Sequence, residues 1–316
     1  MERGWGSPSS YIECFEWLLA PYDLEGKNPN PDLSPHVINN SWYCSQEEGC
    51  NLSNFKLMQD IVKNLKAAGI VVVVSAGNDG GNGCGSVAGP PAIFEQSFSV
   101  GATTITDGIA GFSSRGPVTI DSSFRLKPNV AAPGSGVRSV IRGGGYASYS
   151  GTSMAGPHVA GLVALMISAN RDLEGRVELI EDIIEATAVP KMSTQNCGTF
   201  SGSEIPNAVF GYGRVDAMKA VKRAINPVSS TENITNLDVQ IYPNPSDEWV
   251  TFVVENSLKS IRTINLFTAN GQLVLSQNAD YEGLILTVDV RSLPTGLYLY
   301  EVKSGNSTAR GKLIKL

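Results

Sequence analysis

The segment from Gly151 to Gly161 reads GTSMAGPHVAG and places one small hydroxyl where a glycine-rich chain turns into an apolar helix. That hydroxyl belongs to Ser153, and the residues from Val159 to Met166 are apolar enough to bury the helix. A serine in the first turn of a helix meets unpaired backbone N–H groups and the positive end of the helix dipole, which stabilise a developing oxyanion. Ser153 is therefore a candidate nucleophile. The alternative is an ordinary buried helix with a polar N-cap.

A serine hydroxyl becomes a good nucleophile only when a base takes its proton, and the sequence has two histidines. On a helix, His158 would lie about 140° round the axis from Ser153 and about 7.5 Å along it. His36 begins the apolar run to Trp42, which predicts a strand followed by a loop, and it lies about 13 Å from the end of that strand. Neither ring is placed to face the Ser153 hydroxyl, so we expect both histidines to be structural.

The GTSMAGPHVAG segment resembles the nucleophile helix of subtilisin-like serine proteases (family S8), in which the serine acts with an aspartate and a histidine. The family carries that aspartate in a D-[ST]-G motif and that histidine in an HGTHVAG motif, both ahead of the strand that VINNSW, residues 37–42, resembles. Neither motif occurs in this sequence. The resemblance therefore implies the C-terminal part of a protease domain. The first residues, MERGWGSP, contain no apolar signal sequence, so we expect a truncated protein, with a short complete protein as the alternative.

A second part of the same resemblance, SAGN at residues 75–78, follows the apolar run from Ile70 to Val74. The consecutive valines of that run predict a strand buried on both faces in a parallel sheet. Ligand sites in such sheets gather at the carboxyl ends of strands, which is where Asn78 stands. In the subtilisin family this asparagine donates its side-chain amide to the oxyanion, together with the backbone N–H of the nucleophile, here Ser153. The alternative is a turn asparagine.

Two segments at strand ends resemble the walls of the family's S1 pocket, namely Ser41, Trp42 and Tyr43 in the first and Ser75, Ala76 and Gly77 in the second. The first segment also pairs with the substrate backbone as an added strand in that family. Many relatives have glycine where Tyr43 stands, and a phenol there would narrow or cover the groove. Trp42 would give the pocket an aromatic wall that favours an apolar P1 side chain, or else it is a plain core aromatic.

Strands alternate with helices up to residue 225, which predicts an α/β fold with a parallel sheet flanked by helices. Helices are expected over 54–67 and 177–186, and a short strand over 97–102. The segments FSSRGP and KPNVAAPG, which begin at Phe112 and Lys127, match subtilisin-like motifs, with Asn129 in place of the usual aspartate. The resemblance implies a subtilisin-like peptidase domain over 1–225, incomplete at its N-terminus.

A polar, proline-punctuated linker is expected over 226–236, and beyond it the pattern changes to period two. Short strands are expected at 239–245, 249–254, 263–267, 273–276, 284–290 and 297–302. Asn270-Gly271 between two of these strands is a strong hairpin signal. The features together predict a small all-β sandwich over 237–316.

Three short segments of this second domain resemble the type A sorting domain of the type IX secretion system: YPNP at 242–245, LPTGLY at 293–298 and the terminal GKLIKL. That domain directs cargo across the outer membrane of Bacteroidota, where it is usually removed. The resemblance implies a secreted or cell-surface protein that the type IX machinery handles. The alternative is an accessory carbohydrate-binding or adhesive sandwich.

The net charge of −6 offers no basic footprint for nucleic acid, and no apolar stretch reaches the length of about 18 residues that spans a membrane. Five cysteines suit export into an oxidising space. Cys44 is expected to pair with Cys50, Cys84 and Cys197 are a second candidate pair, and Cys14 is left over. No cysteine or histidine cluster has metal-ligand spacing, so no metal site is expected. No cofactor is identified, and the family's usual calcium loops would lie largely outside the part that this sequence resembles.

These observations support two classes of function. The intact GTSMAGPHVAG and SAGN segments favour a secreted serine endopeptidase that hydrolyses polypeptides. Tyr43 in the groove and the absence of the Asp and His motifs favour a non-catalytic surface or binding protein that retains a protease shell. We expect this polypeptide to be inactive in isolation under either hypothesis, because the base that activates Ser153 is missing.

Overall fold

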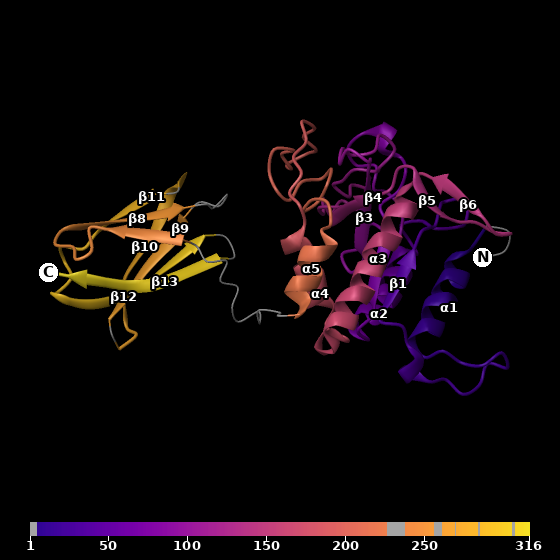
Figure 1. Cartoon of the computed structure of the whole chain (residues 1–316), viewed down its shortest axis with the longest axis horizontal. Coiled ribbons are helices and arrows are strands. Elements are labelled where there is room, and N and C mark those ends of the chain that lie inside the picture. The colour runs from indigo at the N-terminus through magenta and orange to yellow at the C-terminus, as the bar shows by residue number, and fades with distance from the viewer. Residues whose placement is uncertain (1–4, 226–237, 256–260, 269, 284, 305–306) are drawn as a thin grey trace. The chain divides into compact units, whose positions relative to one another are not determined.

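The computed structural model describes residues 5–225, 238–255, 261–268, 270–283, 285–304 and 307–316. The chain divides into two compact units, Met1–Pro227 and Val228–Leu316 (Figure 1). The boundary falls in the stretch for which a linker is predicted, 226–236, and that stretch lies outside the described residues.

A parallel sheet forms the centre of the first unit, in the order β1-β2-β3-β4. Its strands are Val37–Asn40, Val71–Ser75, Phe98–Thr103 and Val130–Pro133. Every residue of β2 is buried, as the run of valines predicts. Because all the strands run the same way, their carboxyl ends meet at one edge of the sheet, and the segments that follow them converge there.

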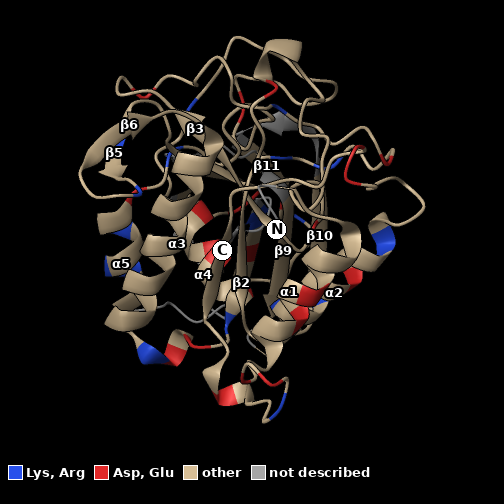
Figure 2. Cartoon of the chain, turned by 90° about the vertical axis from the view of Figure 1, so that its right-hand side faces the viewer, with Lys and Arg blue, Asp and Glu red and all other residues tan. Residues whose placement is uncertain are grey.

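Helices cover both faces of this sheet. Val71 and Val73 belong to an apolar cluster with α3 (Thr152–Ala169), α4 (Val177–Thr187) and α5 (Ala217–Ile225). Val72 and Val74 belong to a second cluster, with α1 (Pro8–Leu19) and α2 (Phe55–Ala67). Successive strand residues point to opposite faces, so a run of buried valines needs a helical layer on each side. Strand β2 has no charged residue, and in Figure 2 the ribbon positions of Lys, Arg, Asp and Glu include several on the covering helices α1, α2 and α5.

The helices predicted over 54–67 and 177–186 and the parallel α/β fold are confirmed. Helix α1 is not among the sequence predictions, although its start carries a signal: the Ser7 hydroxyl accepts a hydrogen bond from the backbone N–H of Ser10, and Pro8 fills the first helical position. The remaining elements of this unit are the 3₁₀ helices Pro31–Leu33, Gly80–Asn82 and Arg171–Leu173 and the hairpin of β5 (Val137–Val140) with β6 (Tyr146–Tyr149).

By length and hydropathy, α3 is the one helix in the described part of the chain that could cross a membrane. It is instead the central core helix of this unit. Ala155, Val159, Val163 and Met166 are fully buried in the cluster that packs on the sheet. Its apolar composition is therefore explained by burial within the protein.

The second unit consists of two antiparallel sheets, in the orders β10-β9-β12-β13 and β11-β8-β7. Its strands are β7 Asp238–Tyr242, β8 Trp249–Glu255, β9 Ile261–Thr268, β10 Leu273–Gly283, β11 Ile285–Asp289, β12 Gly296–Ser304 and β13 Ser307–Lys315. The predicted strands and the all-β class are confirmed, and the last strand, β13, was not predicted. Between β9 and β10, the backbone N–H of Gly271 donates to the Thr268 carbonyl and closes the turn that the sequence predicts.

A buried charge lies beside β4 in the first unit. Lys127 is buried, and its ammonium donates to the Ser97 carbonyl and to the side-chain oxygen of Asn129. The Asn129 amide donates in turn to the Glu185 carboxylate on α4 at 3.0 Å. Asn129 thus acts as a neutral bridge between the lysine and the carboxylate. Burial raises the pKa of Glu185 to about 7, against the Asn129 hydrogen bond, and lowers the pKa of Lys127 to about 7.

This carboxylate makes the stability of the first unit depend on pH. The folded chain keeps the Glu185 proton up to about pH 7, whereas the unfolded chain releases it near the ordinary value of 4.5. The contribution of Glu185 to the free energy of unfolding is therefore fully present below pH 4.5, and it is lost as the pH rises through about 7. We expect Glu185→Gln to reduce the fall in the free energy of unfolding between pH 4.5 and 7, measured by urea denaturation. Glu16→Gln, on an exposed position of α1, should leave that fall as in the parent.

Candidate active site

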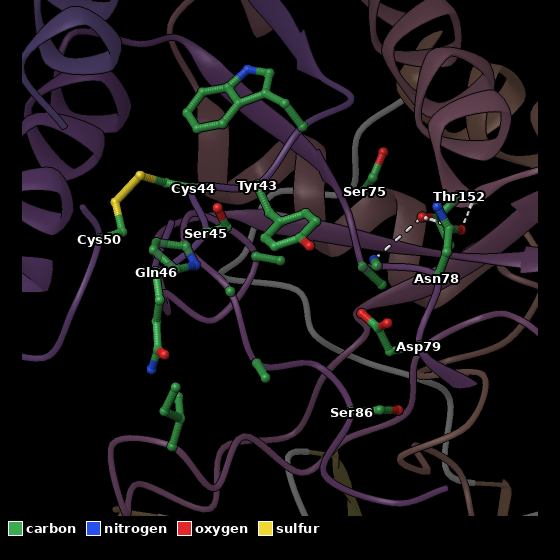
Figure 3. A pocket seen from close by; sticks show the side chains of 18 of the residues that line it. Tyr43, Cys44, Ser45, Gln46, Cys50, Ser75, Asn78, Asp79, Ser86 and Thr152 are labelled. Atoms are coloured by element: carbon green, nitrogen blue, oxygen red, sulfur yellow. Dashed lines mark hydrogen bonds between the residues drawn. A yellow bond between two sulfur atoms is a disulfide. The ribbon is translucent and has the colours of Figure 1, made fainter. Parts of the chain in front are cut away.

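A cavity of about 490 Å³ opens at the carboxyl edge of the parallel sheet, shown in Figure 3. It is bounded by the segments that follow β1 and β2, by the first turn of α3 and by the loop closed by the Cys44–Cys50 disulfide. All the residues that the sequence nominates for the site line this cavity: Ser41, Trp42, Tyr43, Ser75, Ala76, Gly77, Asn78 and Ser153. Segments far apart in the sequence meet here because parallel strands end at one edge.

Asn78 is held by Thr152 in a defined orientation. Its side-chain carbonyl accepts from the Thr152 backbone N–H at 2.9 Å and from the Thr152 hydroxyl at 3.1 Å. The same hydroxyl accepts from the backbone N–H of Gly77 at 3.2 Å. With the carbonyl oxygen occupied, the amide N–H₂ of Asn78 is the end left for another acceptor. Thr152 is absent from the sequence predictions, although a hydroxyl immediately before the candidate nucleophile was a signal that could have marked it.

Ser153 stands half-buried in the first turn of α3. Its carbonyl accepts from the Ser41 hydroxyl at 3.0 Å, and that hydroxyl accepts from the Asn39 amide at 2.9 Å. Helix and strand lie very close here, since a Cβ on Gly156 would come within 2.6 Å of the Asn39 side-chain oxygen. A larger residue at position 156 would therefore require the Asn39 side chain to move, and Asn39 donates to the Ser41 hydroxyl that contacts the Ser153 carbonyl.

The histidines lie where the sequence leads one to expect them, away from the Ser153 hydroxyl. His158 faces back along α3, with its Nδ1 2.9 Å from the Met154 carbonyl. The Nε2 of His36 lies 4.0 Å from Glu174, at the opposite end of β1. Among the described residues, no histidine ring and no carboxylate hydrogen-bonds to the Ser153 hydroxyl, and no three His, Cys, Asp or Glu side chains gather as a metal site.

Tyr43 forms one wall of the cavity, between the disulfide loop and the Ser75 and Asn78 side (Figure 3). Its side chain lies directly on Gly89, because a Cβ there would come within 2.8 Å of a Tyr43 ring carbon. The next residue, Cys44, donates its backbone N–H to the Pro90 carbonyl at 2.9 Å and fixes the two segments together. The Tyr43 ring is therefore part of the cavity wall and packs on Gly89.

Trp42 both lines the cavity and packs into the protein. Its ring is stacked on Tyr11 of α1, with 4.0 Å between centroids, and lies 5.6 Å from the ring of Phe15. The two interpretations of Trp42 offered by the sequence, pocket wall and core aromatic, thus describe two faces of one side chain. Helix α1 is the element that holds this wall in place.

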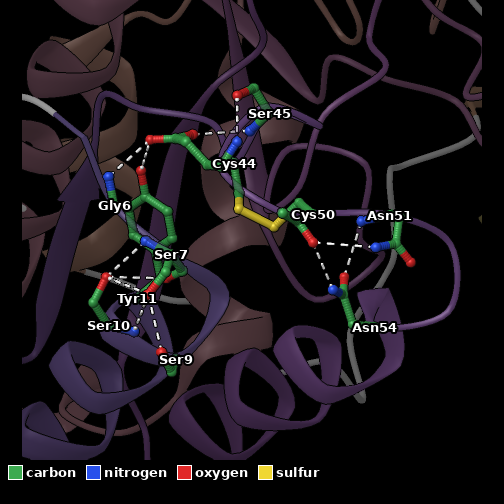
Figure 4. The surroundings of a disulfide bond; sticks show 12 residues. Gly6, Ser7, Ser9, Ser10, Tyr11, Cys44, Ser45, Cys50, Asn51 and Asn54 are labelled. Carbon is green, nitrogen blue, oxygen red and sulfur yellow. Dashed lines mark hydrogen bonds between the residues drawn. A yellow bond between two sulfur atoms is a disulfide. The ribbon is translucent and has the colours of Figure 1, made fainter.

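The disulfide loop is tied to the start of α1 through Glu48 (Figure 4). The Glu48 carboxylate accepts from the backbone N–H of Gly6 at 2.9 Å, from the Tyr11 hydroxyl at 2.7 Å and from the backbone N–H of Ser45 at 2.9 Å. Burial opposes its ionisation, but these hydrogen bonds outweigh burial and hold the pKa of Glu48 below its usual range. The loop that borders the cavity is therefore fixed at both its sulfur bridge and its carboxylate.

Both candidate disulfides are present, Cys44–Cys50 and Cys84–Cys197, and Cys14 is an exposed free cysteine. The second bridge joins positions 113 residues apart. It connects the region after β2 with the segment that leads back to α5. Disulfides of this kind are typical of proteins that work in an oxidising compartment.

The subtilase family matches residues 9–213, and the secretion system C-terminal sorting domain matches residues 240–316. This chain belongs to the subtilase family. A subtilase domain followed by such a sorting domain is the organisation of a secreted or cell-surface protein.

Bacillopeptidase F of Bacillus subtilis (strain 168) is 38% identical to this subtilase over 237 residues, which are 74% of this chain and 15% of that protein. A subtilisin of Bacillus pumilus is 37% identical over 165 residues, 52% of this chain and 51% of its own length. The solved structure of the prenylagaramide maturation protease PagA shares the fold, with a TM-score of 0.51 at 19% identity, over 69% of this chain and 68% of that chain. The chain thus spans about half or less of these curated relatives.

Proposed function

We propose that residues 1–225 are the nucleophile-bearing part of a secreted serine endopeptidase. Ser153 attacks the scissile carbonyl, and the Asn78 amide and the Ser153 backbone N–H stabilise the resulting oxyanion. The observation that carries this assignment is the pair of hydrogen bonds from Thr152 to the Asn78 carbonyl oxygen, because they leave the amide end as a preorganised donor beside Ser153. Preorganised donors cost no reorientation during the reaction.

The base and its orienting carboxylate come, in this proposal, from a segment outside this sequence. Two surfaces of the first unit favour such a segment. Strand β1 has one described neighbour, β2, and its other edge is unpaired among the described strands. Helix α3 leaves Gly161, Ala164 and Leu165 exposed, the last with 57% of its surface accessible. An open strand edge and an exposed apolar helix face are surfaces that proteins normally cover.

The cavity holds the residue on the acyl side of the scissile bond. Residues 41–43 and 75–77 form its walls, and the backbone of 41–43 pairs with the substrate as an added strand. Trp42 contributes an apolar wall, which favours an apolar P1 side chain, and Tyr43 restricts its size. We assign residues 226–236 to a linker and 237–316 to a sorting domain that the type IX machinery recognises.

A non-catalytic binding protein is the second candidate. It is favoured by the lack of a base at the Ser153 hydroxyl in the described part of the chain and by the Tyr43 side chain across the cavity. In that case the same groove would hold a peptide without cleaving it.

The first prediction concerns activity. The purified chain should neither hydrolyse casein nor react with a fluorophosphonate at Ser153, because loss of the base from the related subtilisin lowers kcat by about 10⁶-fold. Co-expression with a subtilisin-like segment that carries the family's D-[ST]-G and HGTHVAG motifs should restore hydrolysis, and Ser153→Ala should abolish it again. Asn78→Ala should then lower kcat by about 10²–10³-fold with little change in KM. Asn82→Ala is the matched control. Casein hydrolysis by the chain alone would contradict the proposal.

The second prediction concerns the pocket. In the restored enzyme, Tyr43→Gly should increase kcat/KM for peptides with large P1 residues relative to alanine, because the phenol no longer occupies the wall over Gly89. The measurement is a comparison of P1 profiles with a peptide library. An unchanged profile would place the phenol outside the P1 subsite.

The third prediction concerns delivery. Residues 237–316, fused behind a signal peptide and a fluorescent reporter in a bacterium with a type IX system, should carry the reporter to the surface or the medium. Removal of Gly311–Leu316 should leave it in the periplasm, since this segment is the C-terminal half of β13. Equal export with and without residues 237–316 would favour the adhesive alternative.

A further inference from the structure

The outer face of the sheet β10-β9-β12-β13 carries a row of exposed apolar side chains. Inward-pointing residues of its last two strands, such as Tyr298, Val302 and Leu313, are buried in the core of the unit. The outward-pointing residues at one end of the sheet are also apolar, and we call them the apolar row: the half-buried Phe267 and the exposed Leu273, Leu297, Leu299, Ile314 and Leu316. Leu297 pairs with Ile314, and Phe267 pairs with both Leu299 and Leu273, so the row is continuous across the strands.

The end of this row is held in place by the YPNP segment. The Asn244 amide donates to the Lys312 carbonyl at 3.1 Å, and its carbonyl oxygen accepts from the backbone N–H of Ile314 at 2.9 Å. Ser246 continues the pairing, with its N–H on the Ile314 carbonyl and its carbonyl accepting from the N–H of Leu316. The backbone groups on the outer edge of the last residues are thus occupied. A partner that binds this end of β13 must therefore contact its side chains, because the backbone is not free to pair with a further strand.

Most of the exposed large apolar side chains in the described part of this unit lie in the apolar row, whereas Tyr242 and Trp249, 52% and 44% exposed, lie on the other sheet. The exposed fractions of Leu297, Ile314 and Leu316 are 45%, 46% and 59%. On the outer face of the other sheet, Thr251 and Thr287 are hydrogen-bonded to each other, and Arg291 lies over Trp249 and pairs with Asp289. Folded domains seldom leave a contiguous apolar patch exposed unless another molecule covers it.

The margin of the row is basic. Lys312 lies opposite Leu299 and has no ion pair in the described part of the unit. Further along the same face, Arg310 and Lys303 both contact Glu301, so this group has two cations for one carboxylate. A partner surface with an apolar centre and carboxylates at its edge would complement both the apolar row and its basic margin.

We propose that the apolar row is the surface through which a protein subunit of the secretion machinery binds this unit, and that the subunit presents an apolar patch edged by acidic residues. The proposal rests on the proposed sorting function and specifies which face of the unit the subunit binds. A protein partner fits better than a lipid surface, because the row lies flat on a sheet and its basic margin includes the paired carboxylate of Glu301. The YPNP segment has a positioning role, since it holds Ile314 and Leu316 on the outer face.

The test compares variants of the full chain, placed behind a signal peptide in a bacterium with a type IX system. Leu297→Ser combined with Ile314→Ser removes the centre of the row, and both side chains are exposed, so the melting temperature of the purified chain should stay close to that of the parent. Export should fall by about tenfold or more, with the chain accumulating in the periplasm, because central apolar contacts dominate such interfaces. Thr251→Ser combined with Thr287→Ser, on the outer face of the other sheet, should be exported like the parent.

Lys312→Glu tests the basic margin, and it should also lower export, whereas Lys63→Glu on the exposed side of α2 should not. Normal export of the Leu297→Ser, Ile314→Ser chain would overturn the proposal. A chain lacking residues 237–316 distinguishes failure of the proposed sorting function from failure of the assigned binding face. If that deletion is exported normally, the sorting function itself fails; if it is retained while the double variant is exported, only the assigned face is wrong.

Two further measurements address other occupants of the row. Sedimentation of the purified parent chain with vesicles of phosphatidylglycerol and phosphatidylcholine, lost in the double variant, would overturn the proposal in favour of a lipid surface. A dimer of the parent in analytical ultracentrifugation that the double variant does not form would overturn it in favour of a second copy of this chain. A monomer that does not sediment with the vesicles, together with reduced export of the double variant, is the expected result.

Discussion

The hydrogen bonds between Asn78 and Thr152 join the end of β2 to the start of α3, and the geometry of the candidate active site depends on them. They place the donor end of an amide, the backbone of Ser153 and the walls of the cavity within one rigid corner of the fold. The Asn39 side chain packs directly over Gly156 at the same corner. In the proposed enzyme, these contacts would hold the oxyanion donors in place within the described residues, among which no histidine ring or carboxylate hydrogen-bonds to the Ser153 hydroxyl.

The cavity is bordered by elements that are themselves fixed from outside the sheet. Trp42 is held by its stacking on Tyr11, and the disulfide loop is held by Glu48, which accepts hydrogen bonds from the start of the same helix. Helix α1 thus supports two walls of the site without carrying a residue of the proposed chemistry. Among the described strands, β1 has no partner besides β2, and α3 leaves Leu165 exposed.

In the second unit, the corresponding constraint is the contact of Asn244 and Ser246 with the last strand. It occupies backbone groups of Lys312, Ile314 and Leu316, the residues of this end whose side chains point to the outer face. Two of the three short motifs that point to a sorting domain in the sequence, YPNP and the terminal GKLIKL, are therefore parts of one structural feature. They are far apart in the sequence but in direct contact in the structure, and this contact positions the two members of the apolar row that follow Lys312, Ile314 and Leu316.

The sequence alone was sufficient for the fold class, for the division into an α/β part and an all-β part, and for the nomination of Ser153, Asn78 and the pocket segments, because these depend on local periodicity and on motifs. It did not predict α1, β13 or Thr152, whose importance comes from contacts with distant residues. It also left both roles of Trp42 open, and only packing against α1 showed that one side chain has both. The roles of Gly89 under Tyr43 and of Asn129 between Lys127 and Glu185 were likewise decided by the tertiary structure, since a close approach or a buried charge exists only once separate segments are brought together.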